Sequence, residues 1–215
     1  MVFSVDMTLV LYYLVNMRKK NKLVCGVGEN DYDGSVGTSG HMIPSYHCWN
    51  NMLNRCYSAK CQVIHPTYIG CIVCEEWLLF SNFKKFYDDN YKKGFVLDKD
   101  ILKIGNKIYS PEYCRFIPVY LNSLLADSGA ARGDLPLGVS ALKPSIKSSR
   151  INITYRAQCN DGYGELIKKA FKTISEAQTW YSITKKRIVK EQVFRAFDNN
   201  EILSDVACAL LEREW

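Results

Sequence analysis

The stretch LDKDILKIGNKIYSPEYCRFIPVYLNSLL, residues 97–125, decides the fold that we expect for the first half of the chain. Asp98 and Asp100 follow an apolar strand at alternate positions, and Gly105-Asn106 is a residue pair typical of a tight hairpin turn. The run 107–109 is expected to pair back as the second strand. The sequence therefore predicts a small hairpin with two acids at the end of its first strand.

A short helix is expected after this hairpin. Ser110, Pro111 and Glu112 have the order of an N-cap, a first helical residue and an acidic first turn. The helix would carry Phe116 and end near residues 122–125. The whole segment is therefore expected to run strand, turn, strand, helix.

Three side chains of this segment carry oxygen ligands. Asp98, Asp100 and Asn122 are hard donors of the kind that magnesium prefers, and one divalent ion held by them could polarise a phosphate. The alternative interpretation is structural. In it the two acids belong to a turn and the asparagine caps the end of the helix.

The order of these residues resembles that of the HNH (ββα-metal) endonucleases found in phages and mobile introns. The resemblance covers about residues 22–125. It includes the upstream patterns Trp49-x-x-Met52-x-x-Arg55-Cys56-Tyr57, Pro66-Thr67-Tyr68 and Val73-Cys74-x-Glu76-Trp77-x-x-Phe80-x-x-Phe83.

The resemblance implies a phage-encoded, site-specific, homing-type endonuclease that hydrolyses duplex DNA with Mg²⁺ or Mn²⁺. In that family an Asp-His pair ends the first strand, with His as the general base, and a carboxylate with a late His or Asn holds the ion. Carried over, the catalytic residues are Asp98, Lys99 and Asn122, and the metal ligands are Asp98, Asp100 and Asn122.

The chain departs from the family pattern at three positions. Lys99 stands in the place of the His, and a lysine can accept a proton from water only as the neutral amine, which requires a strongly lowered pKa. Tyr113 and Val119 stand where the middle Asn and the second metal-binding His are usual. The alternative function is therefore a catalytically inactive, sequence-selective DNA-binding protein derived from an HNH nuclease.

Composition and charge agree with a folded protein that binds a polyanion. A hydrophobic content of 47% over 215 residues excludes a mostly disordered chain. The net charge of +6 fits nucleic acid as a partner without requiring it. The basic residues gather in both halves of the chain, at 18–22, 84–93, 143–156 and 185–195.

The nine cysteines indicate a reducing compartment, because no secretory signal is expected at the start of the chain. The apolar run 8–15 is too short to span a bilayer, so no membrane partner is expected. We expect a cytoplasmic protein, in the bacterial host if the chain is phage-encoded. Cys71-x-x-Cys74 is half of a zinc knuckle, but without a second close-spaced pair structural zinc remains a minor alternative.

The second half of the chain predicts an antiparallel sheet and a helix. The run 151–159 alternates between apolar and polar residues, and a turn at Asn160-Asp161-Gly162 leads to a returning strand at 165–171. An earlier strand is expected to begin at 137–140. Thr173 and Glu176 form a capping box at the start of the helix.

The pieces LPLGV (135–139), YRAQCN (155–160) and AFKTISEAQTWY (170–181) resemble the ethylene-response-factor type of DNA-binding domain. In that family the sheet, not the helix, lies in the major groove. Strand alternation predicts that Tyr155, Ala157 and Cys159 face the helix, together with Ile153. The predicted DNA-binding residues are Arg150, Thr154, Arg156, Gln158, Asn160, Lys168 and Lys169. The alternative is an ordinary sheet that faces solvent.

The expected fold class is therefore α+β: an HNH-like ββα unit braced by helices, then a three-stranded antiparallel sheet packed on one helix. The last stretch has apolar residues at helical spacing and would pack on the preceding domain or pair two copies of the chain as a homodimer. The expected division is a leader at 1–21, an HNH-like domain at 22–126, a linker at 127–134, a DNA-binding domain at 135–197 and a C-terminal helix at 198–215.

Overall fold

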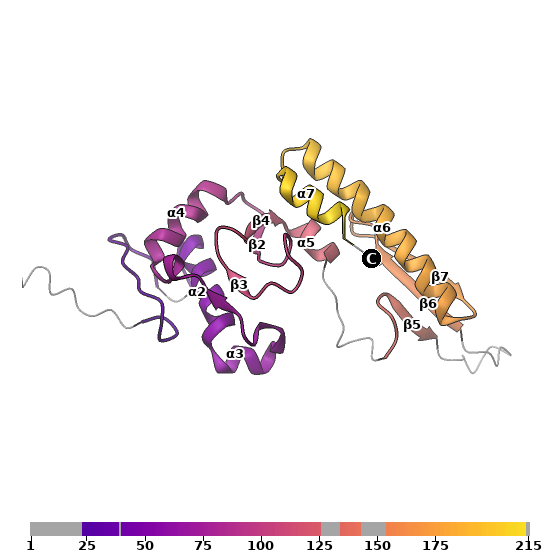
Figure 1. Ribbon diagram of the computed structural model, residues 1–215, viewed down its shortest axis with the longest axis horizontal. Coiled ribbons are helices and arrows are strands. Elements are labelled where there is room, and N and C mark those ends of the chain that lie inside the picture. The colour runs from indigo at the N-terminus through magenta and orange to yellow at the C-terminus, as the bar shows by residue number, and fades with distance from the viewer. Residues whose placement is uncertain (1–22, 39, 126–133, 143–153, 214–215) are drawn as a thin grey trace, which may run out of the picture. The chain divides into compact units, whose positions relative to one another are not determined.

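The computed structural model describes residues 23–38, 40–125, 134–142 and 154–213. The chain forms two compact units, one of Met1–Asn90 with Lys107–Pro111 and one of Tyr91–Asn106 with Glu112–Trp215 (Figure 1). The predicted leader, nearly all of the predicted linker, and residues Arg150 and Ile153 lie outside the described residues.

In its described residues, the first unit contains three α-helices: α2 (Pro44–Tyr57), α3 (Ala59–Ile64) and α4 (Phe80–Asn90). Two 3-10 helices, Pro66–Tyr68 and Glu75–Leu78, lie between α3 and α4. The apolar residues of α2 recur at the i, i+3, i+4, i+7 spacing that predicts a buried helix face, and all of them are buried: Trp49, Met52, Leu53 and Cys56. The Trp49 indole N–H donates to the carbonyl of Trp77 over 2.7 Å, which ties this helix to the segment before α4.

A two-stranded parallel sheet completes the first unit. β1 (Ile72–Val73) pairs with β3 (Ile108–Tyr109). The prediction that residues 107–109 return on the strand before Asp98 is therefore wrong. Tyr109 is buried in this unit, and the burial of such a large side chain favours the pairing with β1.

The second unit begins with β2 (Phe95–Asp98), which pairs antiparallel with β4 (Arg115–Pro118), and α5 (Val119–Leu125) follows directly. Phe116 thus lies on a strand, and the helix expected from residue 111 begins only at Val119. Ile117 is completely buried, with no solvent-accessible surface. A strand covered by protein buries this apolar segment, which accounts for β4 forming here. The order strand, loop, strand, helix holds, with different residues in the second strand.

The rest of the second unit confirms the three-stranded sheet. β5 (Val139–Leu142), β6 (Thr154–Asn160) and β7 (Leu166–Phe171) are antiparallel in the order β5-β6-β7. The long helix α6 (Ile174–Asp198) packs on this sheet and starts with the predicted capping box of Thr173 and Glu176. The described residues thus form a mixed α+β protein with six α-helices.

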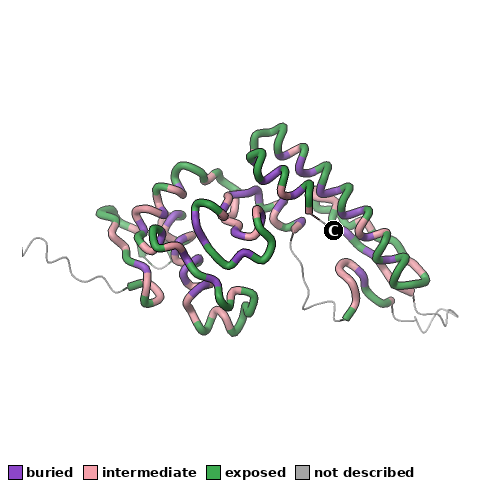
Figure 2. Tube along the Cα trace, viewed as in Figure 1, coloured by how far each residue is buried: buried purple, intermediate pink, exposed green. Residues whose placement is uncertain are grey.

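One apolar core joins the two ends of the second unit. Ile101, Ile117 and Leu121 belong to the same buried cluster as Ala157 of the sheet and Val193 of α6. Figure 2 shows buried positions recurring along α6 and along α7 (Ser204–Leu211). The compact units therefore do not divide at the expected boundary after residue 126.

The C-terminal helix is shorter than expected and belongs to this core. Val206, Ala207 and Leu210 of α7 are buried, and α7 packs on α6. Of the two alternatives for this stretch, packing on the preceding domain is present within the chain. Pairing with a second copy stays a prediction.

Candidate functional sites: an acid pair and an outward sheet face

The two predicted acids lie together at the end of β2. Asp98 is the last residue of the strand, and its Oδ1 accepts the backbone N–H of Asp100 over 2.7 Å. Burial raises the pKa of Asp98 above its ordinary value, and the neighbouring charge of Asp100 acts in the same direction. The Asp100 side chain keeps 45% of its surface exposed. The acid pair therefore has one half-buried and one more open carboxylate.

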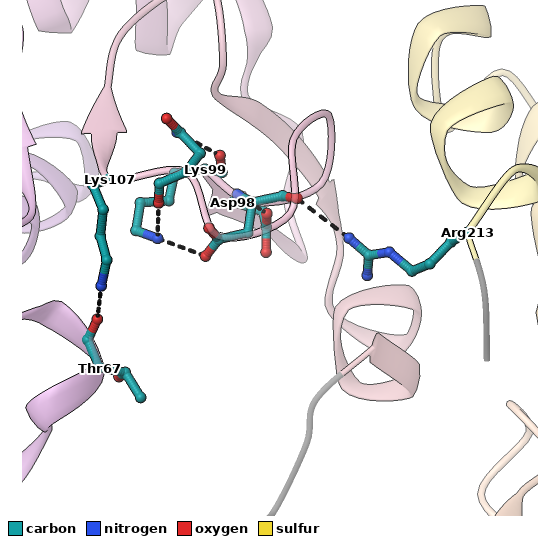
Figure 3. A network of polar contacts seen from close by, with 7 residues as sticks. Thr67, Asp98, Lys99, Lys107 and Arg213 are labelled. Atoms are coloured by element: carbon teal, nitrogen blue, oxygen red, sulfur yellow. Dashed lines mark hydrogen bonds and ion pairs between the residues drawn. The ribbon is translucent and has the colours of Figure 1, made fainter.

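Lys99 forms side-chain hydrogen bonds across the loop that follows the acid pair. Its side chain is only 7% exposed, and its Nζ donates to Asp100 Oδ2 over 2.6 Å and to the carbonyl of Asn106 over 2.7 Å (Figure 3). Asn106 donates back through Nδ2 to the carbonyl of Lys99 over 2.8 Å. These bonds, which we call the Lys99–Asn106 clasp, give Lys99 the contacts of an internal counter-ion instead of those of a base facing water.

Local sequence patterns did not predict the Lys99–Asn106 clasp. Gly105-Asn106 is typical of a hairpin turn, and Gly105 does adopt a positive φ of +74°. The Asn106 side chain, however, is buried and bonds across the loop. The only signal in the sequence was an asparagine after a glycine, which suits an ordinary turn equally well.

Two arginines near the acid pair were also missed. Arg115 lies opposite Asp98 in the β2–β4 ladder, yet its Nε and Nη2 donate to Asp205 Oδ2 over 2.9 and 2.7 Å. Arg213 donates through Nη2 to the carbonyl of Asp100 over 3.2 Å (Figure 3). Burial lowers the pKa of Arg213, while the charges of Asp98 and Asp100 oppose that shift. Both contacts join residues about 90 or more positions apart, so local sequence patterns do not predict them.

The predicted metal ligands are brought together only in part. Asp98 and Asp100 are neighbours, and Asn122 is half-buried on α5. Across the described ranges, no group of three or more His, Cys, Asp or Glu side chains is placed to hold a metal ion. Cys71 and Cys74, the pair considered for zinc, are free thiols, and Cys71 is buried like a small apolar residue.

Replacing Asp98 by asparagine is expected to raise the melting temperature at pH 7. The pKa of Asp98 is higher in the folded state than its unfolded value of 3.8, so folding favours the protonated carboxyl. The stabilisation from the protonated form is fully present below pH 3.8, and it is lost as the pH rises through the folded-state pKa. The ionised carboxylate therefore costs stability at neutral pH, and asparagine keeps the oxygen acceptor without the charge.

Thermal unfolding between pH 3 and pH 8 would check this, and the gain should shrink as the pH falls. The exposed Asp134 offers a matched Asp134→Asn control, which should show no such gain. Equal effects of the two substitutions would contradict the assignment.

The second candidate site is the face of the sheet that points away from α6. Ala157 and Cys159 are buried, and Tyr155 packs on the same core, so the predicted helix-facing residues of β6 are confirmed. The alternate residues have the opposite orientation: Arg156 is half-buried, and Gln158 is exposed.

Strand register extends this outward face to β5 and β7. Arg156 lies between Ser140 and Ala170, and Gln158 lies opposite Lys168. Directly paired residues share a face, so Lys168 belongs with the predicted DNA-binding residues.

Lys169 does not share that face. It pairs with the buried Ala157, and its Nζ lies 5.5 Å from the centre of the Phe171 ring. The register therefore separates Lys169 from Lys168 and from the predicted DNA-binding residues of β6, because one step along a strand reverses the side on which the side chain lies.

The remaining two predicted members lie at the ends of β6. Thr154 pairs with Leu142. Asn160 is exposed, but its Oδ1 accepts the N–H of Gly162 over 2.7 Å. An amide with its oxygen used in the turn can offer mainly its Nδ2 donors to a ligand.

These features define the molecule as an α+β protein with a clasped acid pair and a polar sheet face. No protein-family model, curated protein or solved structure matches the chain. Within the described residues, no helix combines the length and apolar character needed to cross a bilayer.

Proposed function

We propose that the protein binds duplex DNA through the outward face of β5, β6 and β7. The observation that carries the proposal is the register of Arg156, Gln158 and Lys168 on one exposed face. Arginine can bond guanine through two atoms, glutamine can bond adenine in the same way, and lysine suits phosphate or guanine. An ordinary solvent-facing sheet does not require these three side chains to lie together.

The dimensions of the sheet agree with this proposal. Three strands spaced by about 4.8 Å give a backbone width of about 10 Å, which suits a major groove about 12 Å wide when the strands run along it. Outward residues two positions apart are then about 6.8 Å from one another, so Arg156 and Gln158 would meet base pairs that are adjacent or separated by one. The net charge of +6 favours association with the phosphate backbone.

Selection of binding sites from a random duplex library tests the proposal. A short enriched sequence with guanine and adenine close together is the expected outcome, and its affinity should fall steeply as salt rises. Binding without any enriched sequence would leave only backbone contacts and would contradict base reading by this face.

A metal-dependent DNA endonuclease at Asp98, Asp100 and Asn122 is the second candidate function. It is favoured by the buried Oδ1 of Asp100, which has no hydrogen-bond partner and is a carboxylate oxygen suited to a cation. The order of β2, β4 and α5 also agrees with the ββα resemblance. It stands second because Lys99 occupies the other oxygen of Asp100 and does not have the contacts of a general base.

Incubating the selected duplex with the protein and Mg²⁺ or Mn²⁺ separates the two candidates. If the acid pair is a nuclease site, nicks should appear that chelator prevents, and Asp98→Ala should abolish them while leaving DNA affinity largely unchanged. Intact DNA in the presence of tight binding would favour the binding protein without hydrolysis.

A further inference from the structure

The turn between β6 and β7 is held by hydrogen bonds of its own and by contacts with α6. Gly162 and Gly164 have φ values of +84° and +107°, which glycine adopts readily. Glycine also loses more conformational entropy on folding than other residues, which lowers the stability of the turn. Asp161 Oδ1 accepts the backbone N–H groups of Tyr163 and Glu165 over 2.7 and 3.0 Å. These bonds are exposed to water, where a single hydrogen bond stabilises a turn only modestly, so packing of the turn on α6 adds to its stability.

Two side chains of α6 supply this support. Gln192 is fully buried and donates through Nε2 to the carbonyl of Asp161 over 3.2 Å. The Gln192 side chain also packs so closely on Gly162 that a Cβ there would lie 2.6 Å from Gln192 Cδ. The first half of the turn is therefore fitted to α6.

Arg195 holds the second half. Its Cζ lies over the Tyr163 ring, 4.7 Å from the ring centre, and over the Tyr120 ring of α5, 4.5 Å from the ring centre, so the guanidinium contacts both aromatic rings. The Tyr120 hydroxyl in turn donates to Glu201 Oε2 over 2.6 Å.

This arrangement adjoins one end of the proposed DNA-binding face. Asn160 is the last residue of β6 and the first of the turn, and its side chain is oriented by its bond to Gly162. Gln158 lies two residues before it on the same face. Arg156 and Thr154 lie farther from the turn, toward the opposite end of the strand.

We propose that Arg195 is a positioning residue that holds the β6–β7 turn through Tyr163 and so fixes the turn end of the base-reading face. The part of the inference that concerns DNA rests on the proposed function. The part that concerns the turn does not, and each can be tested separately.

The first test is hydrogen exchange of the backbone amides of Tyr163 and Glu165 in the free protein. Loss of a cation–π contact of ordinary strength should speed their exchange about 2- to 30-fold in Arg195→Gln and in Tyr163→Ala. Arg187→Gln is a matched control, since Arg187 is an exposed arginine of the same helix that pairs with Glu191. Unchanged exchange in Arg195→Gln, or an equal change in the control, would overturn the inference.

The second test uses the selected duplex and its single base-pair variants. Arg195→Gln should lose affinity about 2- to 30-fold, with weaker discrimination only at the base pairs nearest Asn160 and unchanged discrimination at the base pair assigned to Arg156. Arg195→Lys should restore part of the loss because it keeps a cation beside the two rings. A uniform loss at all positions would show general destabilisation and would overturn the positioning role.

Two further results keep these tests decisive. Tyr163 is 69% exposed, so Tyr163→Ala leaves the core intact and can replace Arg195→Gln if that variant fails to fold. If the parent protein selects no duplex, the proposed function fails, and the positioning role is judged on the hydrogen exchange alone.

Discussion

Arg156→Ala is expected to weaken binding to the selected duplex by about 5- to 150-fold and to relax base preference at one position. The magnitude follows from about 1–3 kcal/mol of discrimination for a good bidentate contact between arginine and guanine. The register supports a large effect, because Ser140 and Ala170 beside Arg156 are too small to replace its contact. Competition binding with single base-pair variants of the duplex measures both quantities.

Lys168→Ala is the matched comparison on the same face. If Lys168 contacts a phosphate, its removal should weaken binding about equally for all duplexes and reduce the salt dependence by about one charge. Lys169→Ala lies on the opposite face and should have the smaller effect. An Arg156→Ala variant that keeps its base preference would contradict the assignment of that residue.

The second large effect is expected at Gly138, immediately before β5. A Cβ at this position would lie 2.1 Å from Cε2 of the buried Tyr181, and the φ of +74° disfavours any other residue. Gly138→Ala should lower the free energy of unfolding by about 2–5 kcal/mol, the sum of a left-handed backbone penalty and an overpacking penalty. DNA binding should fall in parallel, because the carbonyl of Gly138 also accepts the N–H of Gln158 over 2.9 Å.

Gly105 provides a control with the same backbone angle. Its φ is also +74°, but nothing lies within 4 Å of the position that a Cβ would occupy. Gly105→Ala should therefore cost only the backbone term of about 1–2 kcal/mol. Urea unfolding of both variants measures the difference, and equal losses would show that the contact with Tyr181 is unimportant.

The acid pair illustrates how far local patterns reach. That Asp98 and Asp100 lie together follows from their separation by one residue, and the structure agrees. The clasp formed by Lys99 and Asn106 depends on the path of the loop between them. The approach of Arg213 depends on where α7 packs, so no local pattern contained it.

The two strand predictions show the same distinction. The alternation along β6 identified the buried and outward residues, because a single sheet covered by one helix repeats every two residues. The face of Lys169 required the register between β6 and β7, which a turn with two glycines does not specify from sequence alone.

By itself, the sequence determined the α+β class, the sheet of three antiparallel strands, the capped helix on it and the buried stripe of α2. Each of these depends on hydrophobic periodicity or on residues a few positions apart. Only the tertiary structure decided that β2 pairs with β4, that β3 pairs with β1, and that residues 101–124 share a core with the C-terminal half. Those choices depend on which distant apolar side chains, such as Tyr109 and Ile117, can be buried together, and that free energy is absent from any local stretch of the chain.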